Sequence, residues 1–153
     1  MITTTVGELL DGELNDLDTM YHDLYIVRDA EIVFYVGKSR DVIGRLLGHC
    51  GRGTWGRGQV KSQLGCFIER NLPESRDWTI KLLTEKDAHG VVQFLSAGVW
   101  YDVEAAERAL IGHYGPCLNV TYNEEPEAIP DKYKHPLGEL DLEVTASDFI
   151  PMR

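Results

Sequence analysis

Long apolar runs and paired cysteines are both missing from this sequence of 153 residues. No apolar stretch approaches the ~18 residues of a membrane-spanning helix, and residues 1–10 lack the basic and apolar regions of a signal peptide. The three cysteines (Cys50, Cys66 and Cys117) are widely spaced and form no CxxC pair, which argues against a disulfide framework and a structural zinc site. We therefore expect a reduced, cytoplasmic protein with no membrane partner.

Several common enzyme motifs are missing as well. The sequence has no P-loop of the form GxxxxGKS or GxxxxGKT, and no GxSxG elbow. A small-molecule enzyme of ordinary α/β type therefore has little support. No helix-turn-helix or zinc-finger pattern is evident to supply sequence-specific binding of nucleic acid.

The formal net charge of −10 is unevenly distributed. Residues 1–24 carry six acidic side chains and no lysine or arginine, whereas residues 25–70 carry eight basic and four acidic side chains. A polyanion responds to the local field within about a Debye length, ~8–10 Å, more than to the total charge. The basic block suits an anionic substrate, although basic residues that only solvate helix faces would give the same pattern.

Three β-branched and aromatic runs predict strands. The first two, 24–27 and 32–36, lie on either side of the polar stretch 28–31 and indicate an antiparallel hairpin. The third, 78–83, alternates apolar and polar side chains. Residues 91–100 fit either a strand or a short helix.

Apolar stripes at helical spacing predict helices over 40–49, 60–71 and 103–113. Ser39 or Asp41 can cap the first helix, and Asp102 the last. The resulting order β-β-α-α-β-α indicates an α/β (α+β) fold with a small three-stranded, mainly antiparallel sheet flanked by helices.

The chain divides into three predicted segments. Residues 1–22 form an acidic N-terminal arm that is part helix, because leucines recur there at near-helical spacing. Residues 23–121 form the folded domain. Residues 122–153 form an acidic, proline-containing tail.

Five polar residues in the predicted domain could carry chemistry. Tyr25 and Tyr35 lie on the two hairpin strands, and Arg45 and His49 are four residues apart on one helix, so their side chains project from neighbouring turns. An arginine and a titratable imidazole side by side suit phosphoryl chemistry. Glu107 is a carboxylate of the kind that Mg²⁺ prefers. Taken singly, each residue is more often structural or merely on the surface.

A glycine-rich loop follows the first predicted helix, with glycine at 51, 53, 56 and 58. Arg52 and Arg57 flank Trp55 there, which suits nucleic acid through phosphate contacts and stacking. The alternative is that Trp55 packs onto the domain or forms an oligomer contact.

These residues occur in an order that resembles the GIY-YIG nuclease family. Arg45 follows Tyr35 by ten residues and His49 follows Arg45 by four, as the family pattern expects. The matching segments are Asp23-Leu24-Tyr25, Phe34-Tyr35-Val36-Gly37-Lys38-Ser39, and Glu107 with Leu110-Ile111, Pro116 and Asn119. The last of these is similar to the closing segment of bacterial excision-repair endonucleases. One departure is Asp23, which stands where the family has glycine and adds negative charge.

The resemblance implies a Mg²⁺- or Mn²⁺-dependent endonuclease that hydrolyses DNA phosphodiester bonds with a single metal ion held by Glu107. It implies that Tyr25 is the general base, helped by His49 or Lys38, that Tyr35 orients water or phosphate, and that Arg45 stabilises the transition state. Asn119 would fix the loop after the last helix, or Tyr25 itself. The residues expected to bind nucleic acid are Gly37, Lys38, Arg40, Arg52, Trp55, Arg57 and Lys61.

The expected partner is DNA, either duplex or branched. Cutting both strands would call for a homodimer or a partner protein that supplies specificity, and both remain open. The alternative function is a catalytically inactive module on the same fold that binds nucleic acid or protein. Asp23 and the acidic total charge favour that alternative, whereas the complete set of polar residues favours the enzyme.

Overall fold

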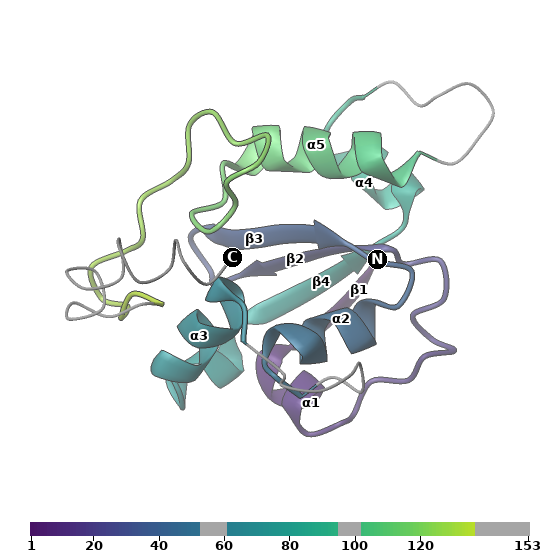
Figure 1. Cartoon of the computed structure of the whole chain (residues 1–153). Coiled ribbons are helices and arrows are strands. Elements are labelled where there is room, and N and C mark those ends of the chain that lie inside the picture. Colours follow the sequence, from purple (N-terminus) through teal and green to yellow (C-terminus); the bar gives the residue numbers. More distant parts are fainter. Residues whose placement is uncertain (53–60, 95–101, 137–153) are drawn as a thin grey trace, which may run out of the picture.

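A four-stranded antiparallel sheet with helices on both faces forms the centre of the molecule (Figure 1). This computed structural model describes residues 1–52, 61–94 and 102–136. In spatial order the strands are β1 (Ile2–Thr5), β4 (Thr79–Leu83), β2 (Leu24–Arg28) and β3 (Val33–Lys38). The helices described are α1 (Val6–Leu10), α2 (Val42–His49), α3 (Gln63–Arg70), α4 (Glu85–Val91) and α5 (Val103–Tyr114), with a 3-10 turn η1 (Glu74–Asp77).

The predicted hairpin is confirmed as β2 and β3. The two strands pair antiparallel with Ile26 opposite Val36, and the Asp29 carboxylate closes the turn by accepting hydrogen bonds from the backbone N–H groups of Glu31 and Ile32. A short acidic side chain that satisfies backbone donors in this way is a common device of tight turns. The hairpin brings Tyr25 and Tyr35 to neighbouring strands on one face of the sheet.

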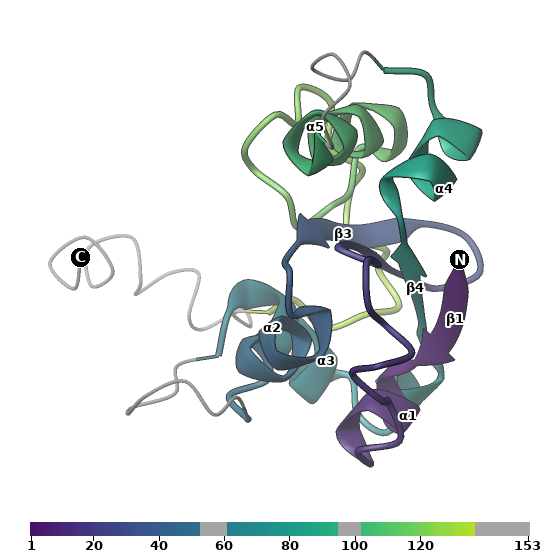
Figure 2. The same cartoon turned by 90° about the vertical axis from the view of Figure 1, so that its right-hand side faces the viewer.

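Each face of the sheet buries its own apolar core, and Figure 2 shows the two helical layers on opposite sides. Because side chains alternate along a strand, β2 sends Tyr25 and Val27 to one face and Leu24 and Ile26 to the other. The first face packs against α1, α2 and α3, and the second against α4 and α5. The sheet therefore stands between α2 and α5, and both of these helices will contribute to the site.

The three predicted strands are present, but the sheet has a fourth strand, β1, that the prediction of three strands did not include. Residues of the expected arm form β1, which pairs with β4 in the register Thr4 to Ile80, and helix α1, whose Val6 and Leu9 are buried. The helical part of the predicted arm is α1, which ends at Leu10. Beyond it Leu14 packs against the core, whereas Leu17 is 74% exposed.

Aspartate side chains cap the N-termini of α2 and α5, as the sequence predicted. Asp41, rather than Ser39, caps α2 by accepting a hydrogen bond from the N–H of Gly44, and Asp102 caps α5 by accepting from Ala105. Gly115 ends α5 in the left-handed conformation, with φ of 56°.

Helix α4 has no counterpart among the predicted helices. The ambiguous stretch 91–100 lies partly outside the described residues, as do residues 137–153 of the predicted tail.

The described part of the tail packs against the domain. The Tyr133 ring lies within an aromatic cluster with Phe34, Phe67 and Trp78, and its hydroxyl donates to the Asp29 carboxylate at 2.6 Å.

Among the described residues, no helix is long and apolar enough to cross a membrane.

Candidate functional site

Two tyrosines and a histidine form the centre of the candidate site. Tyr25 is 1% exposed and its hydroxyl hydrogen-bonds Nε2 of His49 at 2.9 Å. The Tyr35 ring stacks on Tyr25 with 6.1 Å between centroids and lies edge-on to His49 at 5.3 Å. Three polar rings, carried by β2, β3 and the last turn of α2, are therefore in contact with one another.

Gly37 has a steric role here that the sequence did not reveal. It pairs with Tyr25 across the hairpin, and a Cβ atom at this position would lie 2.3 Å from the Tyr25 hydroxyl oxygen. That distance is far below van der Waals contact, so only glycine leaves room for the phenol. Gly37 was expected to bind nucleic acid; its visible contribution is to hold Tyr25 in position.

We expect Gly37→Ala to displace the Tyr25 ring, because the hydroxyl and the rigid ring have no flexible end that could give way. Overpacking of this kind costs roughly 1–3 kcal/mol. Chemical denaturation measures that loss in the free energy of unfolding. The matched change Gly48→Ala adds a methyl group to α2 where nothing lies within 4 Å, and should leave stability unchanged or slightly raised. A loss no larger for Gly37→Ala than for Gly48→Ala would contradict the steric role.

Burial sets the charge states of the hydrogen-bonded pair. Burial, followed by the charge of Tyr35, raises the pKa of Tyr25, while Arg45 acts in the opposite direction. Burial, followed by Arg45, lowers the pKa of His49 to about 4. At neutral pH the pair is therefore a protonated phenol beside a neutral imidazole. A neutral imidazole has an unprotonated nitrogen that can accept a hydrogen bond from the phenol, whereas the two pKa shifts oppose full transfer of the proton.

Arg45 projects from α2 one turn before His49, and its side chain is exposed. Its positive charge lowers the pKa values of both Tyr25 and Tyr35, against the larger effect of burial, which raises them. The guanidinium thus lies where it can bind an anion beside the two phenols.

Glu107 reaches the same site from the opposite helical layer. It lies on α5, which packs over β3, and its charge raises the pKa values of Tyr25 and Tyr35. The side chain is half-buried. Burial raises its own pKa, and the nearby positive charge of Lys38 opposes that rise. Side chains from β2, β3 and α2 are thus in contact, and the charge of Glu107 from α5 acts on the two tyrosines.

The described residues contain no group of three or more histidine, cysteine, aspartate or glutamate side chains that could enclose a metal ion. Mg²⁺ keeps several waters and often takes only one or two protein carboxylates beside substrate phosphate. Glu107, whose carboxylate is half-buried and lies near the positive charge of Lys38, is the side chain that could hold such an ion.

Asn119 contacts the strand rather than Tyr25. Its amide accepts from the backbone N–H of Val36 at 2.8 Å and donates to the carbonyl of the same residue at 2.9 Å. The neighbouring N–H of Leu118 donates to the carbonyl of Phe34. The loop after α5 therefore covers the outer edge of β3, which fixes the strand that carries Tyr35.

The residues expected to bind nucleic acid fall into two separate places. Lys38 and Arg40 line a hollow of about 370 Å³ with Asp23, Asp102 and Glu104. The carboxylate of Asp23, the departure noted in the sequence, thus shares this hollow with two basic side chains.

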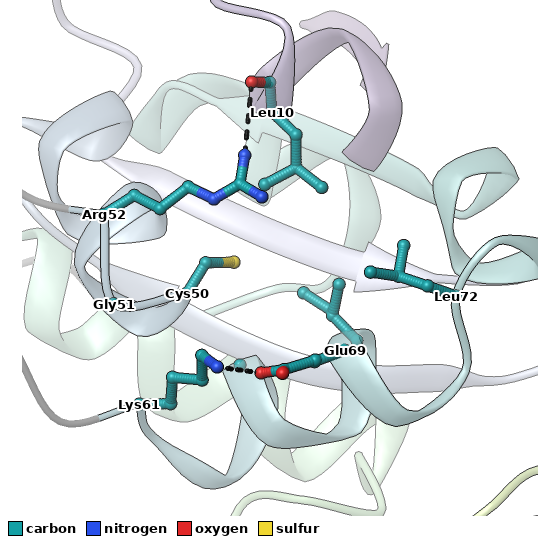
Figure 3. A pocket seen from close by; sticks show the side chains of 9 residues that line it. Leu10, Cys50, Gly51, Arg52, Lys61, Glu69 and Leu72 are labelled. Atoms are coloured by element: carbon teal, nitrogen blue, oxygen red, sulfur yellow. Dashed lines mark hydrogen bonds and ion pairs between the residues drawn. The ribbon is translucent and has the colours of Figure 1, made fainter.

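Arg52 and Lys61 line a different hollow of about 320 Å³ between α1, α2 and α3 (Figure 3). Arg52 points across it to the carbonyl of Leu10, and Lys61 pairs with Glu69. Trp55 and Arg57 lie outside the described residues. Within the described part, the expected basic residues thus line two different hollows, Lys38 and Arg40 in one and Arg52 and Lys61 in the other.

Ser62 belongs to the site although nothing in the sequence analysis singled it out. Its hydroxyl contacts Nδ1 of His49 at 2.5 Å, on the side of the ring away from Tyr25. The only local signal is that Ser62 is a good residue to cap α3, which it does by accepting from the N–H of Gly65. Its pairing with His49 depends on how α2 and α3 pack, which no local pattern encodes.

Comparison with protein-family models, with curated proteins and with solved structures found no match to this chain.

Proposed function

We propose that this protein is a metal-dependent endonuclease of the GIY-YIG type that hydrolyses phosphodiester bonds in DNA. The observation that supports the proposal is the contact of two phenols with a buried imidazole, on which the charges of a guanidinium, Arg45, and a carboxylate, Glu107, act. These are the groups that the motif spacing in the sequence assigns to one reaction. Many anionic substrates would suit the basic residues alone, whereas few reactions need this complete set.

Each residue has a role that follows from its chemistry. Arg45 binds the scissile phosphate and stabilises the charge that develops on it in the transition state. Tyr25 activates the attacking water, and His49 is placed to accept the phenol proton at 2.9 Å. Tyr35, half-buried beside Tyr25, orients the water or a phosphate oxygen by hydrogen bonding.

Glu107, with Lys38 beside it, is the residue that would hold the divalent cation. When bound, such a cation supplies positive charge that favours the phenolate form of Tyr25 and the departing oxygen. In the reaction, water loses a proton to the Tyr25 phenolate and its oxygen forms a bond to phosphorus. The bond from phosphorus to the 3′ oxygen breaks, and that oxygen gains a proton. The products carry 5′-phosphate and 3′-hydroxyl ends.

A panel of labelled substrates tests the proposal: duplex, single-stranded, flapped and branched DNA, and RNA of the same sequence. We expect cleavage of at least one DNA substrate in Mg²⁺ or Mn²⁺ and none with excess chelator, with 5′-phosphate ends on the products. Cleavage that persists in chelator, or that leaves 3′-phosphate ends, would contradict the proposed chemistry.

Arg45→Ala should reduce the rate of cleavage by at least ~10²-fold, the scale of losing one donor to transition-state charge. The measurement is single-turnover cleavage at saturating enzyme, which separates the chemical step from binding. Arg70→Ala removes an exposed arginine from the end of α3, outside the site, and should leave the rate unchanged. Equal rates for the two variants would make Arg45 an ordinary surface residue.

A second candidate function is a binding module that has the same site but does not cleave. It is favoured by Asp23 in the hollow with Lys38, and by the pKa shifts that hold Tyr25 protonated and His49 neutral. This candidate predicts DNA binding in the panel, with no product in any metal ion.

A further inference from the structure

The histidine of the site has a second partner on the far side of its ring. His49 is 3% exposed, and its Nδ1 lies 2.5 Å from the Ser62 hydroxyl oxygen. The backbone fixes this contact from both directions. The N–H of Ser62 donates to the His49 carbonyl at 3.1 Å, and the Ser62 hydroxyl accepts from the N–H of Gly65 at 3.2 Å. Ser62 therefore cannot move away from the ring without disturbing the start of α3.

The packing of α2 against α3 makes this placement rigid. A Cβ atom at Gly65 would lie 1.7 Å from the His49 carbonyl oxygen, so the two backbones are in direct contact at this point. Only glycine permits such an approach. The distance between the His49 ring and the Ser62 hydroxyl is thus set by the helix contact rather than by side-chain rotamers alone.

The surroundings of Tyr25 indicate which nitrogen of His49 carries the proton. The positive charge of Arg45 acts on the Tyr25 hydroxyl, and a cation favours the lone pairs of the phenol oxygen, not its proton, on the side that faces it. The buried O–H of Tyr25 must then donate, and Nε2 of His49 lies 2.9 Å away to accept it. An accepting Nε2 carries no proton. Because a neutral imidazole has one N–H, that proton is on Nδ1 and is donated to Ser62.

From this network we infer that Ser62 is a positioning residue of the proposed nuclease, and that it holds His49 in the tautomer whose Nε2 accepts the proton of Tyr25. The inference rests on the proposed function for its role in catalysis. When the transfer occurs, the O–H bond of Tyr25 breaks and an N–H bond forms at Nε2. The products are a phenolate and an imidazolium that still donates from Nδ1 to Ser62. The hydroxyl of Ser62 touches neither substrate nor metal in this scheme.

The spectrum of the imidazole nitrogens tests the tautomer without any assay of activity. In the wild-type protein, long-range ¹⁵N–¹H correlation should show the His49 ring protonated at Nδ1 and unprotonated at Nε2. In Ser62→Ala the Nδ1 proton has lost its acceptor, so we expect a shift of population toward the Nε2-protonated form. A wild-type ring protonated at Nε2 overturns the inference, whether or not the variant folds.

Kinetics test the consequence. Ser62→Ala should lower kcat by roughly 10–100-fold, the range found for residues that orient a functional histidine, with KM unchanged. Ser62→Thr keeps a hydroxyl at the same position and should recover most of the loss. Thr84→Ala is the matched control because Thr84 caps α4 in the same manner, away from the site. It should lower the melting temperature as Ser62→Ala does, without lowering kcat.

The outcomes separate the two proposals. Absence of cleavage by the wild type would refute the proposed function, and the nitrogen spectrum would still decide whether Ser62 fixes the tautomer. An active wild type with an unchanged kcat in Ser62→Ala, or an equal loss in Thr84→Ala, would reduce Ser62 to a helix cap.

Discussion

Glu107→Gln should abolish cleavage while leaving the fold and weak DNA binding intact. Glutamine keeps the size of the side chain but removes the charge that would hold the cation. Loss of metal-derived stabilisation of the transition state, on the order of 4 kcal/mol, corresponds to about 10³-fold in rate. Single-turnover cleavage measures the rate, and Mn²⁺ titration followed by electron paramagnetic resonance measures metal binding directly.

Glu104→Gln is the control for this change. Glu104 lies one turn earlier on α5, is exposed and forms an ion pair with Arg108. Because exposed pairs of this kind contribute roughly 0–1 kcal/mol, its loss should alter neither stability nor cleavage appreciably. If Glu104→Gln lost metal binding and Glu107→Gln kept it, the carboxylate would have been assigned to the wrong turn of the helix.

The raised pKa of Glu107 adds a pH dependence to this expectation. A carboxyl group with a raised pKa loses its negative charge at a higher pH than an ordinary glutamate does. Metal binding should therefore weaken as the pH falls through that raised pKa, and recover as the pH rises above it. Mn²⁺ affinity measured across the acidic range should show this weakening. Any residual Mn²⁺ binding by Glu107→Gln should not depend on pH in this range.

Tyr25→Phe is the second change with a large expected effect. It removes the hydroxyl that would activate water, a contribution of about 10²–10⁴-fold for a positioned acid–base group. It also leaves Nε2 of the buried His49 without its partner, which costs roughly 1–3 kcal/mol of stability. The ring itself remains to stack on Tyr35, so the fold should persist. Single-turnover cleavage and chemical denaturation measure the two losses.

Tyr133→Phe provides the comparison for Tyr25→Phe. It also removes a phenol hydroxyl with a hydrogen bond, here to Asp29 at the turn of the hairpin. Stability should fall, whereas the rate of cleavage should remain within a few-fold of wild type. A rate for Tyr25→Phe as high as that for Tyr133→Phe would mean that another group activates the water.

The sequence predicted those parts of the fold that depend on local patterns. The hairpin has a period of two and a polar turn, and α2 and α5 have apolar stripes with aspartate caps at Asp41 and Asp102. These local features place Tyr25, Tyr35, Arg45 and Glu107 on their elements. The motif spacing predicts that these residues meet at one place; Tyr25, Tyr35 and His49 are in contact, and the charges of Arg45 and Glu107 act on the two tyrosines.

Features that depend on long-range pairing escaped prediction. β1 is a four-residue segment, Ile-Thr-Thr-Thr, with one large apolar side chain, and it forms a strand because it pairs with the edge of β4. The leucine spacing did not show where α1 ends, at Leu10, because Leu14 still packs against the core while Leu17 and Met20 are exposed. Ser62 was missed for the same reason as β1: its partner, His49, is 13 residues away and is brought near only by the packing of two helices.

The net charge of −10 is less informative than the position of each charge. Lys38 and Arg45 lie close enough to the site to alter the pKa values of Glu107 and the two tyrosines. Many acidic groups are on the surface elsewhere, and salt screens those that are exposed and distant.

Nicking of supercoiled plasmid in Mg²⁺ shows whether the site around Tyr25 cleaves DNA, with wild type, Glu104→Gln and Glu107→Gln purified in parallel. We expect nicked or linear DNA with wild type and Glu104→Gln in Mg²⁺, none with Glu107→Gln, and none with any protein in excess chelator. Cleavage by Glu107→Gln at the wild-type rate in Mg²⁺ would contradict it, because the site around Tyr25 would then not be the source of the activity.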